Sequence, residues 1–373
     1  METILYFSGH QWLPGGNGRH DGLMEALAQH VRVIYAQPPE FSRSLIKFPK
    51  PRIERVRDGF WLLHNAFGMR FSRIGKKLGG IAVLVDTPWI QRELAAQGVG
   101  DYVYWDSCPD PMSHWGVAGT RFVYDCIDPC FVESHQAAMD QVERVAAKNA
   151  RVVFATADAL LQRMKSFGAN AHLLPNGVRG GDYHPSVLSK LQRPASLAGR
   201  GGPVVNFLGT LDWRFDAETV TFAAKSLPDF TFCIAGRVNA DQGSRVAELR
   251  RLPNVVLPGA VSNEDGHAYT WHCDAAIIPF IPGRIGDAIN PCKLYMYLMA
   301  GKPVIGTDTR ELRRFPQHVA TARTGEEFAA AVRQAVETDG AEKRAARTSF
   351  AASNRWEDRA AEAVRILKAQ GLL

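Results

Sequence analysis

The chemistry that the sequence indicates most clearly is anion binding by Lys293, at the start of a short helix. Residues 290–306 predict a polar loop, an apolar helix and an aliphatic strand, with Pro291 in the first helical turn and Gly301 just past the helix end. Backbone N–H groups of a first turn and the positive end of the helix dipole attract phosphate. A cation there does not stabilise the helix, so we expect an anionic ligand; a solvated surface lysine is the alternative.

A second candidate phosphate-binding cation, Arg214, follows another predicted strand in the same half of the chain. The strand ends at Gly209, whose missing side chain permits a ligand to approach the backbone. The fork of donors on Arg214 can clamp a phosphate. Asp216 comes two residues later and is expected to cap the following helix.

A nucleotide base could lie against the loop that contains Gly236 and Arg237, which follows the strand predicted over 231–235. Its glycine again permits backbone contact with a ligand. Arg237 could stack on the base or join the phosphate site, and a surface arginine is the alternative.

The first half of the chain has its own glycine-rich loop. Gly15 and Gly16 follow the first predicted strand, and Arg19 and His20 open the helix after it, so this loop could cradle a diphosphate. The spacing is not Gly-x-Gly-x-x-Gly, and no acidic residue closes the second strand, which disfavours a nicotinamide dinucleotide site. The chain also lacks the P-loop pattern of nucleotide triphosphatases.

A candidate general base is Asp128, at the carboxyl end of the strand predicted over 122–127. Side chains alternate along a strand, so Asp125 and Asp128 are expected on opposite faces, and Asp128 is the one expected to reach a cleft. A carboxylate there could accept a proton or hold a substrate hydroxyl. The alternative is a helix N-cap, and lesser rivals for the base are Asp106 and His20.

The elements that position these residues alternate between strands and helices, which predicts an α/β fold of two doubly wound halves. Strands are expected over 3–8, 31–36, 60–65, 102–105, 122–127, 152–155, 172–174, 204–209, 231–235, 255–257, 275–280 and 304–306. Helices are expected near 74–97, 132–148, 157–167, 217–227, 242–251, 265–273 and 291–300, and a final helical region over 326–369 is expected to break near 339–340. We expect domains at 1–180 and 203–350, a linker at 181–202 and a final helix at 351–373, with ligands bound in the cleft at the carboxyl ends of the strands.

Bulk properties fit a two-domain cytoplasmic protein. The 373 residues exceed what one core accommodates, no apolar run approaches a membrane span, and no signal peptide is evident. The six cysteines are scattered without the spacing of a zinc site, so we expect reduced thiols and no metal.

The net charge of +6 is concentrated between residues 41 and 80, where basic residues alternate with aromatic ones. Such a segment suits an anionic membrane surface, at about 1 kcal/mol for each charge near the headgroups. Nucleic acid or a pyrophosphate-bearing lipid would also fit its charge. The alternative is a solvated basic face whose aromatic side chains point inward.

Taken in order, these motifs resemble nucleotide-sugar glycosyltransferases of the GT-B fold, particularly bacterial enzymes of cell-surface polysaccharide synthesis such as teichuronic acid and xanthan-type glucuronosyltransferase relatives. The resemblance covers nearly the whole chain. It includes the Gly-Gly loop with Arg19 and His20, the strand at 124–128, and the segments 173–178, 207–210, 235–237, 274–280, 291–304 and 356–359.

The resemblance implies two Rossmann-like domains facing across a cleft. The first would take the acceptor, with the phosphate loop of Gly15, Gly16, Arg19 and His20. The second would hold the donor through Lys293, Arg214, Gly209, Thr210, Gly236, Arg237, Asn290 and Leu294. Bound cations would stabilise the departing nucleoside diphosphate, so neither metal nor other cofactor is expected.

The sequence departs from the family at Met296, where many relatives carry a glutamate that holds the ribose hydroxyls. Methionine accepts such hydrogen bonds only weakly. The upstream acid of retaining members also has no clear match, with Asp287 the nearest residue. Either other groups bind the ribose or the chain is a divergent member, and we favour inversion with Asp128 as base.

The resulting expectation is a metal-independent transferase moving a hexosyl or hexuronosyl group from a UDP-sugar to a saccharide or polyprenyl-diphosphate-linked acceptor. The 41–80 segment would attach it peripherally to the cytoplasmic face of the inner membrane, and no nucleic-acid partner is expected. The alternatives are a sugar-nucleotide 2-epimerase of the same fold and a non-catalytic nucleotide-sugar-binding subunit.

Overall fold

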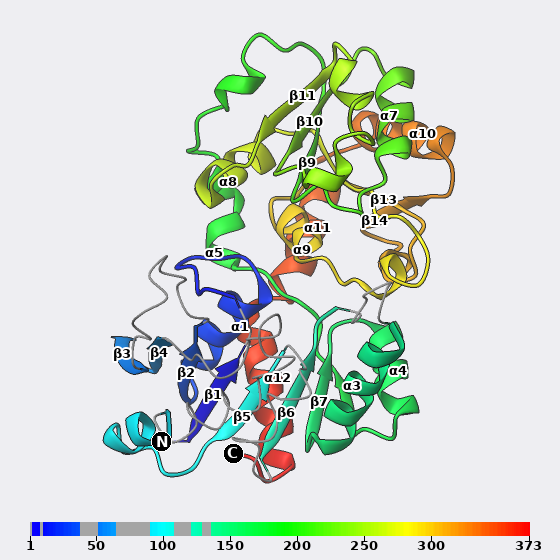
Figure 1. Ribbon diagram of the computed structural model, residues 1–373. Helices are drawn as coiled ribbons and strands as arrows, with labels where there is room; N and C mark the ends of the chain where they lie inside the picture. Colours follow the sequence, from blue (N-terminus) through cyan, green and yellow to red (C-terminus); the bar gives the residue numbers. More distant parts are fainter. Residues whose placement is uncertain (1, 8–9, 38–50, 65–89, 108–120, 129–135) are drawn as a thin grey trace. The chain divides into compact units, whose positions relative to one another are not determined.

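The computed structural model describes residues 2–7, 10–37, 51–64, 90–107, 121–128 and 136–373. The chain divides into two compact units (Figure 1). The first consists of Met1–Pro175 together with Trp356–Leu373, and the second of Asn176–Arg355. The chain therefore leaves the first unit once and returns to it with its last helix.

The first unit is built on an eight-stranded sheet in the order β3-β4-β2-β1-β5-β6-β7-β8. Its strands are β1 (Thr3–Phe7), β2 (Arg32–Ala36), β3 (Arg52–Arg57), β4 (Phe60–His64), β5 (Val103–Asp106), β6 (Phe122–Cys126), β7 (Val152–Ala155) and β8 (Ala171–Leu173). Neighbouring strands are parallel except for the edge pair β3 and β4. The central strands are buried apolar runs, as expected for a parallel sheet covered on both faces.

Helices of the first unit include α1 (Arg19–Leu27), α3 (Gln136–Asn149), α4 (Asp158–Ser166) and the returning α12 (Trp356–Ala369). Residues 90–96 are also helical, and the rest of the helix expected near 74–97 lies outside the described residues, apart from residue 97. Helices α1 and α12 pack side by side (Figure 1). Their contact requires Gly22, because a Cβ there would stand 2.2 Å from the indole nitrogen of the buried Trp356. The tryptophan that marks the last helix in the sequence thus anchors that helix on α1.

The second unit has a six-stranded parallel sheet in the order β11-β10-β9-β12-β13-β14. Its strands are β9 (Val204–Leu208), β10 (Thr231–Ala235), β11 (Val255–Gly259), β12 (Ala275–Ile278), β13 (Val304–Thr307) and β14 (Val319–Ala322). Its helices are α5 (Gly180–Tyr183), α6 (Pro185–Leu188), α7 (Ala217–Ser226), α8 (Asn263–Trp271), α9 (Cys292–Met299), α10 (Gly325–Glu337) and α11 (Ala341–Ala352).

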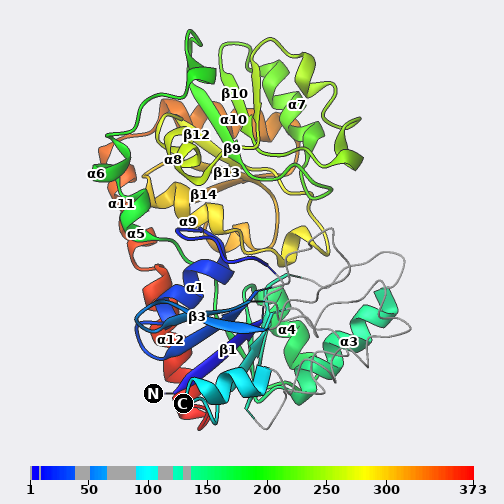
Figure 2. The same cartoon turned by 60° about the vertical axis from the view of Figure 1, so that its left-hand side comes forward.

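Each face of this second sheet has its own apolar core. Helices α7 and α10 cover one face, and α8, α9 and α11 contribute to the core of the other. Helix α9 lies beside α5 (Figure 2). The C-terminal end of α9 is a turn in which Gly301 adopts φ +73°. The N–H of Gly301 donates to Leu298 O, and the N–H of Lys302 donates to Tyr297 O. The expected helix end at Gly301 is therefore what the structure shows.

The structure differs from the expected elements in several places, and the expected final helix at 351–373 is α12 (Trp356–Ala369), which follows the separate helix α11. Residues 181–202 are not a free linker, because Tyr183, Leu188 and Leu197 are fully buried in the core of the second unit. The helix expected over 242–251 is replaced by two 3-10 turns, Ala240–Gln242 and Leu249–Arg251. Strands β3 and β14 were not expected, since β3 is mostly charged and β14 is short and alanine-rich.

The basic segment 41–80 is described only over residues 51–64. Within that part, Phe60 is buried in the sheet while the side chains of Arg55 and Arg57 stay mostly exposed on the edge strand β3. The guanidinium of Arg57 also lies 5.6 Å from the centre of the Phe60 ring. Elsewhere the segment lies outside the described residues. No helix among the described residues is long and apolar enough to cross a bilayer.

Candidate functional site

The strand order of the second sheet places a ligand site at the carboxyl end of β9. The chain runs from β9 to β10 on one side, and β12 returns to pair on the other side of β9. Such a reversal of strand order creates a crevice at the carboxyl ends of open α/β sheets. The loops that leave β9 and β12 carry Arg214 and lead to Lys293, so both predicted cations belong to this sheet edge.

Backbone hydrogen bonds hold these two loops together. The N–H of Asp216 donates to Pro279 O at 2.8 Å, and the N–H of Ile281 donates to Arg214 O at 2.8 Å. The cations are thus mounted on loops that are tied to each other as well as to the sheet.

Lys293 occupies the first turn of α9 and is partly buried. Its Nζ lies 4.1 Å from the centre of the Phe207 ring and 5.2 Å from that of Phe280. A Cβ at position 209 would stand 2.5 Å from Nζ, so the glycine provides the space in which the ammonium lies. The ammonium is therefore held over aromatic rings at the sheet edge rather than extended into solvent.

This environment changes the ionisation of Lys293. Burial, followed by the positive charge of Arg214, lowers the pKa of Lys293 to about 7, and the Asp212 carboxylate partly opposes that shift. Within the described part of the chain, no carboxylate forms an ion pair with Lys293. A partly buried cation with a strongly lowered pKa and no counter-ion is typical of a functional site and suits an anionic ligand.

Arg214 is held by Asp212, a residue that the sequence analysis did not select. The guanidinium Nη2 donates to Asp212 Oδ2 at 2.6 Å, and Nε lies 3.0 and 3.1 Å from Oδ1 and Oδ2. The backbone N–H of Arg214 also donates to Oδ1 at 2.9 Å, which closes a turn. Spacing of an aspartate two residues before an arginine is the signal that could have identified this pair.

The predicted base-binding loop at Gly236 is packed against the β9 loop. Gly236 has φ +154°, and a Cβ there would stand 1.7 Å from the carbonyl oxygen of Gly209. Its glycine is therefore explained by contact between two backbones rather than by ligand approach. Arg237 and Thr210 are exposed beside it, and their donor roles stay predictions.

Asn290 and Leu294, which were also predicted to bind the nucleotide-sugar donor, have structural roles instead. The buried Asn290 side chain accepts from Asn176 N at 2.8 Å and donates to Glu311 Oε1 at 2.8 Å. Leu294 is fully buried in the apolar core. These two side chains support the loop and helix that carry Lys293, and they do not face a ligand.

Met296, where the sequence differs from the glycosyltransferases that it resembles, is part of the same core. Met296 is 7% exposed and packs on the inner face of α9. Asp287, the nearest match to the missing acid, accepts from the backbone N–H of Arg310 at 2.6 Å. Met296 therefore offers no carboxylate to a ribose, and Asp287 holds the backbone at Arg310.

In the first unit, Arg19 is a structural residue. Its guanidinium forms a bidentate pair with Asp125, with Nη2 2.8 Å from Oδ1 and Nε 2.9 Å from Oδ2. Its Nη1 donates to Leu174 O at 2.9 Å. Arg19 and Asp125 are only 2% and 0% exposed, which corrects the expectation that Arg19 binds an acceptor phosphate. The pair instead fixes the start of α1 to β6.

The glycine loop of the first unit also differs from a phosphate cradle. Gly15 adopts φ +70°, and a Cβ at Gly16 would stand 2.2 Å from the Asp21 carboxylate. That carboxylate accepts from the backbone N–H of Leu13 at 3.1 Å. The Asp21 carboxylate lies at the start of α1, where a phosphate would bind, and it would repel a diphosphate. The glycines instead allow the loop to pack against Asp21.

The remaining candidates in the first unit lie near the carboxyl ends of its strands. His20 Nδ1 lies 2.6 Å from the hydroxyl of the buried Tyr6. Asp106 is 1% exposed and accepts from Tyr104 OH at 3.1 Å, which makes it a poor candidate for a base. Asp128 is exposed two residues beyond the end of β6, and its catalytic role stays a prediction.

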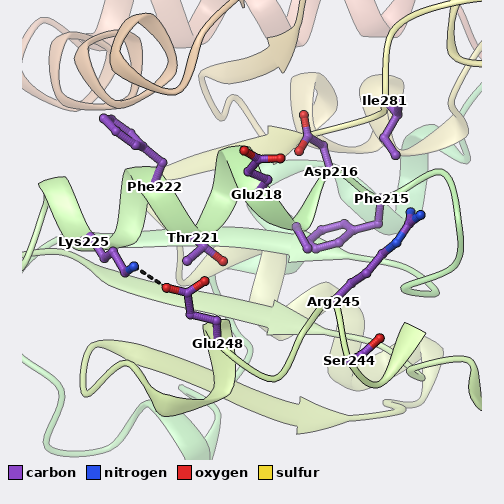
Figure 3. Close-up of a pocket in the computed structure, with 11 residues that line it drawn as sticks. Phe215, Asp216, Glu218, Thr221, Phe222, Lys225, Ser244, Arg245, Glu248 and Ile281 are labelled. Atoms are coloured by element: carbon purple, nitrogen blue, oxygen red, sulfur yellow. Dashed lines mark hydrogen bonds and ion pairs between the residues drawn. The ribbon is translucent and has the colours of Figure 1, made fainter. Parts of the chain in front are cut away.

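A separate hollow of about 680 Å³ lies along α7 in the second unit (Figure 3). It is lined by charged and apolar side chains, among them the ion pair of Lys225 with Glu248. Asp216 also lines it and caps α7 as expected, accepting from Thr219 N at 3.0 Å. The hollow does not include Arg214 or Lys293, so it is distinct from the predicted donor site.

The chain is similar in sequence to a curated glycosyltransferase and in fold to several solved structures. No family model matches the chain. A curated protein from Bacillus subtilis (strain 168), named as the teichuronic acid biosynthesis glycosyltransferase TuaH, is 27% identical over 203 residues. That match covers 50% of this chain and 50% of TuaH, so the chain spans about half the length of this curated relative.

Solved structures match the whole chain at low identity. The sucrose-phosphate synthase of Thermosynechococcus elongatus has a TM-score of 0.72 at 15% identity, covering 99% of both chains. The Anabaena protein Alr3699/HepE, solved in complex with UDP, has a TM-score of 0.66 at 17% identity, covering 99% of this chain and 100% of the other. At these identities the likeness concerns the fold.

Proposed function

We propose that this chain, which has the GT-B fold and is similar to glycosyltransferases, transfers a hexosyl or hexuronosyl group from a UDP-sugar to a saccharide acceptor. The observation that carries the proposal is the Lys293 ammonium, which lies without a carboxylate partner in the described residues, next to Arg214 at the switch point of the second sheet. A diphosphate bound there would supply the missing negative charge. Binding of UDP by the similar Anabaena protein supports this choice of nucleotide.

In this proposal the reaction exchanges one bond to the sugar C1 atom for another. The bond from C1 to the β-phosphate oxygen breaks, and UDP leaves with the bonding electrons. Lys293 and Arg214 stabilise the charge that develops on that oxygen, in the role that metal ions have in other transferases. The acceptor hydroxyl oxygen forms the new bond to C1, and its proton goes to the Asp128 carboxylate.

We further propose an acceptor of cell-surface polysaccharide synthesis, either a saccharide or one linked to a polyprenyl diphosphate. TuaH, a teichuronic acid biosynthesis glycosyltransferase by name, supports this class. The charge of the 41–80 segment supports peripheral attachment to the cytoplasmic face of the inner membrane.

A panel of nucleotide sugars tests the donor assignment. A ligand present at 100 times its dissociation constant stabilises a protein by about 2.7 kcal/mol, so the correct UDP-sugar is expected to raise the melting temperature measurably. Incubation of that donor with the protein and no acceptor then separates transfer from 2-epimerisation, since only an epimerase changes the sugar. A chain that binds UDP-sugars but transfers nothing to any saccharide would be a binding subunit.

The role of Asp128 gives a kinetic prediction. Asp128→Asn is expected to slow transfer by about 10²- to 10⁴-fold, because the amide cannot accept the hydroxyl proton in the transition state. The dissociation constant of UDP, measured by calorimetry, should stay unchanged, since Asp128 lies in the other unit from the predicted donor residues. Transfer by the variant at the rate of the unmodified protein would exclude Asp128 as the base.

The lowered pKa of Lys293 gives a pH prediction. Lys293 must be charged to attract the diphosphate, and its pKa in the free protein is about 7. The affinity for UDP-glucose is therefore expected to be highest below pH 7. As the pH rises above 7 it should fall by up to about tenfold per unit, until the raised pKa of the complex is passed.

Calorimetry between pH 6 and 9 checks this dependence. The two phosphates of UDP-glucose are both esterified and do not titrate in that range, and the uracil N3–H begins to titrate only near pH 9. Up to pH 8 the ligand therefore contributes no slope of its own. Binding at pH 8 is also expected to take up protons, which buffers of different ionisation enthalpy reveal. An affinity that is constant across this range would contradict the assignment of Lys293 to the diphosphate.

A further inference from the structure

We infer that Asp212 is a positioning residue of the donor site, which fixes the Arg214 guanidinium beside Lys293 so that both cations meet the diphosphate. This inference rests on the proposed function and adds a residue to it. Asp212 is a carboxylate at a site that is proposed to bind an anion, so its presence there needs a physical explanation.

The contacts show how Asp212 orients its partner. Both carboxylate oxygens accept from the Arg214 side chain, and Oδ1 also accepts from the Arg214 backbone N–H. Rotation of the guanidinium would break the bidentate pair, so its direction is set. The Asp212 side chain is 11% exposed and that of Arg214 is 32% exposed, so the arginine is the more accessible partner.

The Asp212 side chain closes one turn of the loop backbone through Oδ1, and an asparagine keeps an oxygen in that place; other bonds hold the rest of the loop. The N–H of Leu211 donates to Arg237 O at 2.8 Å, at the start of the loop. At its end, Asp216 and Ile281 form the two backbone bonds described above. Beyond that one turn, what the Asp212 side chain adds is the orientation and the charge balance of Arg214.

The charge of Asp212 also acts on Lys293. Arg214 lowers the pKa of Lys293 by repulsion, and Asp212 raises it by attraction. Cys292 also raises it, by less than Asp212. Without the Asp212 charge, both cations would repel each other more strongly, and Lys293 would lose its proton at a lower pH.

The Asp212→Asn variant tests this role, because asparagine keeps the shape and removes the charge. We expect its dissociation constant for UDP-glucose to rise at least tenfold at pH 7, while that for uridine, which has no phosphate, stays unchanged. The pH at which UDP-glucose affinity begins to fall should also move below that of the unmodified protein. A general loss of loop structure would weaken the binding of uridine as well and would not shift the pH profile.

Asp216→Asn is the matched control. Asp216 lies in the same loop and loses the same charge, but its carboxylate caps α7 and faces the hollow of Figure 3. Asparagine is also a good N-cap, so this variant should fold normally. Its UDP-glucose affinity and pH profile should match those of the unmodified protein.

Asp212→Glu is a second test variant. It keeps the negative charge and alters the geometry of the pair with Arg214. Its pH profile should stay near that of the unmodified protein, while its affinity for UDP-glucose falls between those of the unmodified protein and Asp212→Asn. The inference is overturned if Asp212→Asn binds UDP-glucose as well as or better than the unmodified protein, or if its pH profile does not move. If the unmodified protein binds no UDP-sugar, the proposed function itself is wrong, which is a different outcome.

Discussion

Lys293→Met is expected to raise the dissociation constant of UDP-glucose by about 10- to 150-fold, because a charge-assisted contact contributes roughly 1.5–3 kcal/mol. The same change should leave the melting temperature of the free protein equal or higher. In the free protein the Lys293 ammonium lies over Phe207 and Phe280, and its pKa is strongly lowered because burial disfavours the charge. An uncharged methionine of similar length avoids this cost. Calorimetry and thermal unfolding measure the two effects.

Lys225→Met is the matched control for that substitution. Lys225 of α7 forms an exposed ion pair with Glu248 (Figure 3), and both line the hollow that does not include Arg214 or Lys293. Exposed pairs contribute little to stability, and this one should not affect the nucleotide. A Lys293→Met variant that binds UDP-glucose like this control would show that the diphosphate lies elsewhere.

Asp125→Asn is expected to lower the free energy of unfolding by about 3–5 kcal/mol, which is the usual result when one member of a buried pair is removed. The variant leaves the Arg19 charge at 2% exposure without its bidentate partner. Urea titration of the purified protein measures the loss. Since Arg19 ties α1 to β6 and to Leu174 O, the variant should also loosen the start of α1.

Arg19→Met should cause a loss of similar size, since it leaves the Asp125 carboxylate buried and unpaired. The comparison is Arg52→Met, which removes an exposed arginine paired with Glu54 on the edge strand and should change stability little. If Arg19→Met instead kept full stability and weakened acceptor binding, the structural role assigned to the Arg19 pair would be wrong.

If Arg214 and Lys293 bind the donor as proposed, they are an example of charged groups that serve function at the expense of stability. Arg214 and Lys293 repel each other in the free protein, and Asp212 offsets only part of that repulsion. Functional sites commonly retain such unfavourable groups because the ligand completes them. A bound diphosphate would remove the repulsion, which is why ligand binding and proton uptake are expected together.

Several features of the site could be predicted from the sequence because they depend on neighbouring residues. The cap at Asp216, the left-handed Gly301 and the place of Lys293 in a first turn all follow from local backbone rules. The GT-B fold followed from the order of strands and helices together with the motifs that resemble the family. Expectations for Arg19, Asn290 and Leu294 failed, because each was judged without knowing its partner.

The sequence by itself determined the alternation of strands and helices, the family resemblance, and the two cations of the second half, since periodicity and helix-end chemistry act within a few residues. Only the tertiary structure decided which charged groups are buried in pairs and which, like Lys293, lie over aromatic rings without an ion pair among the described residues. Arg19 and Asp125 are 106 residues apart, and the rings around Lys293 come from two different strand ends. Burial and pairing between distant residues set ionisation, and no local pattern encodes them.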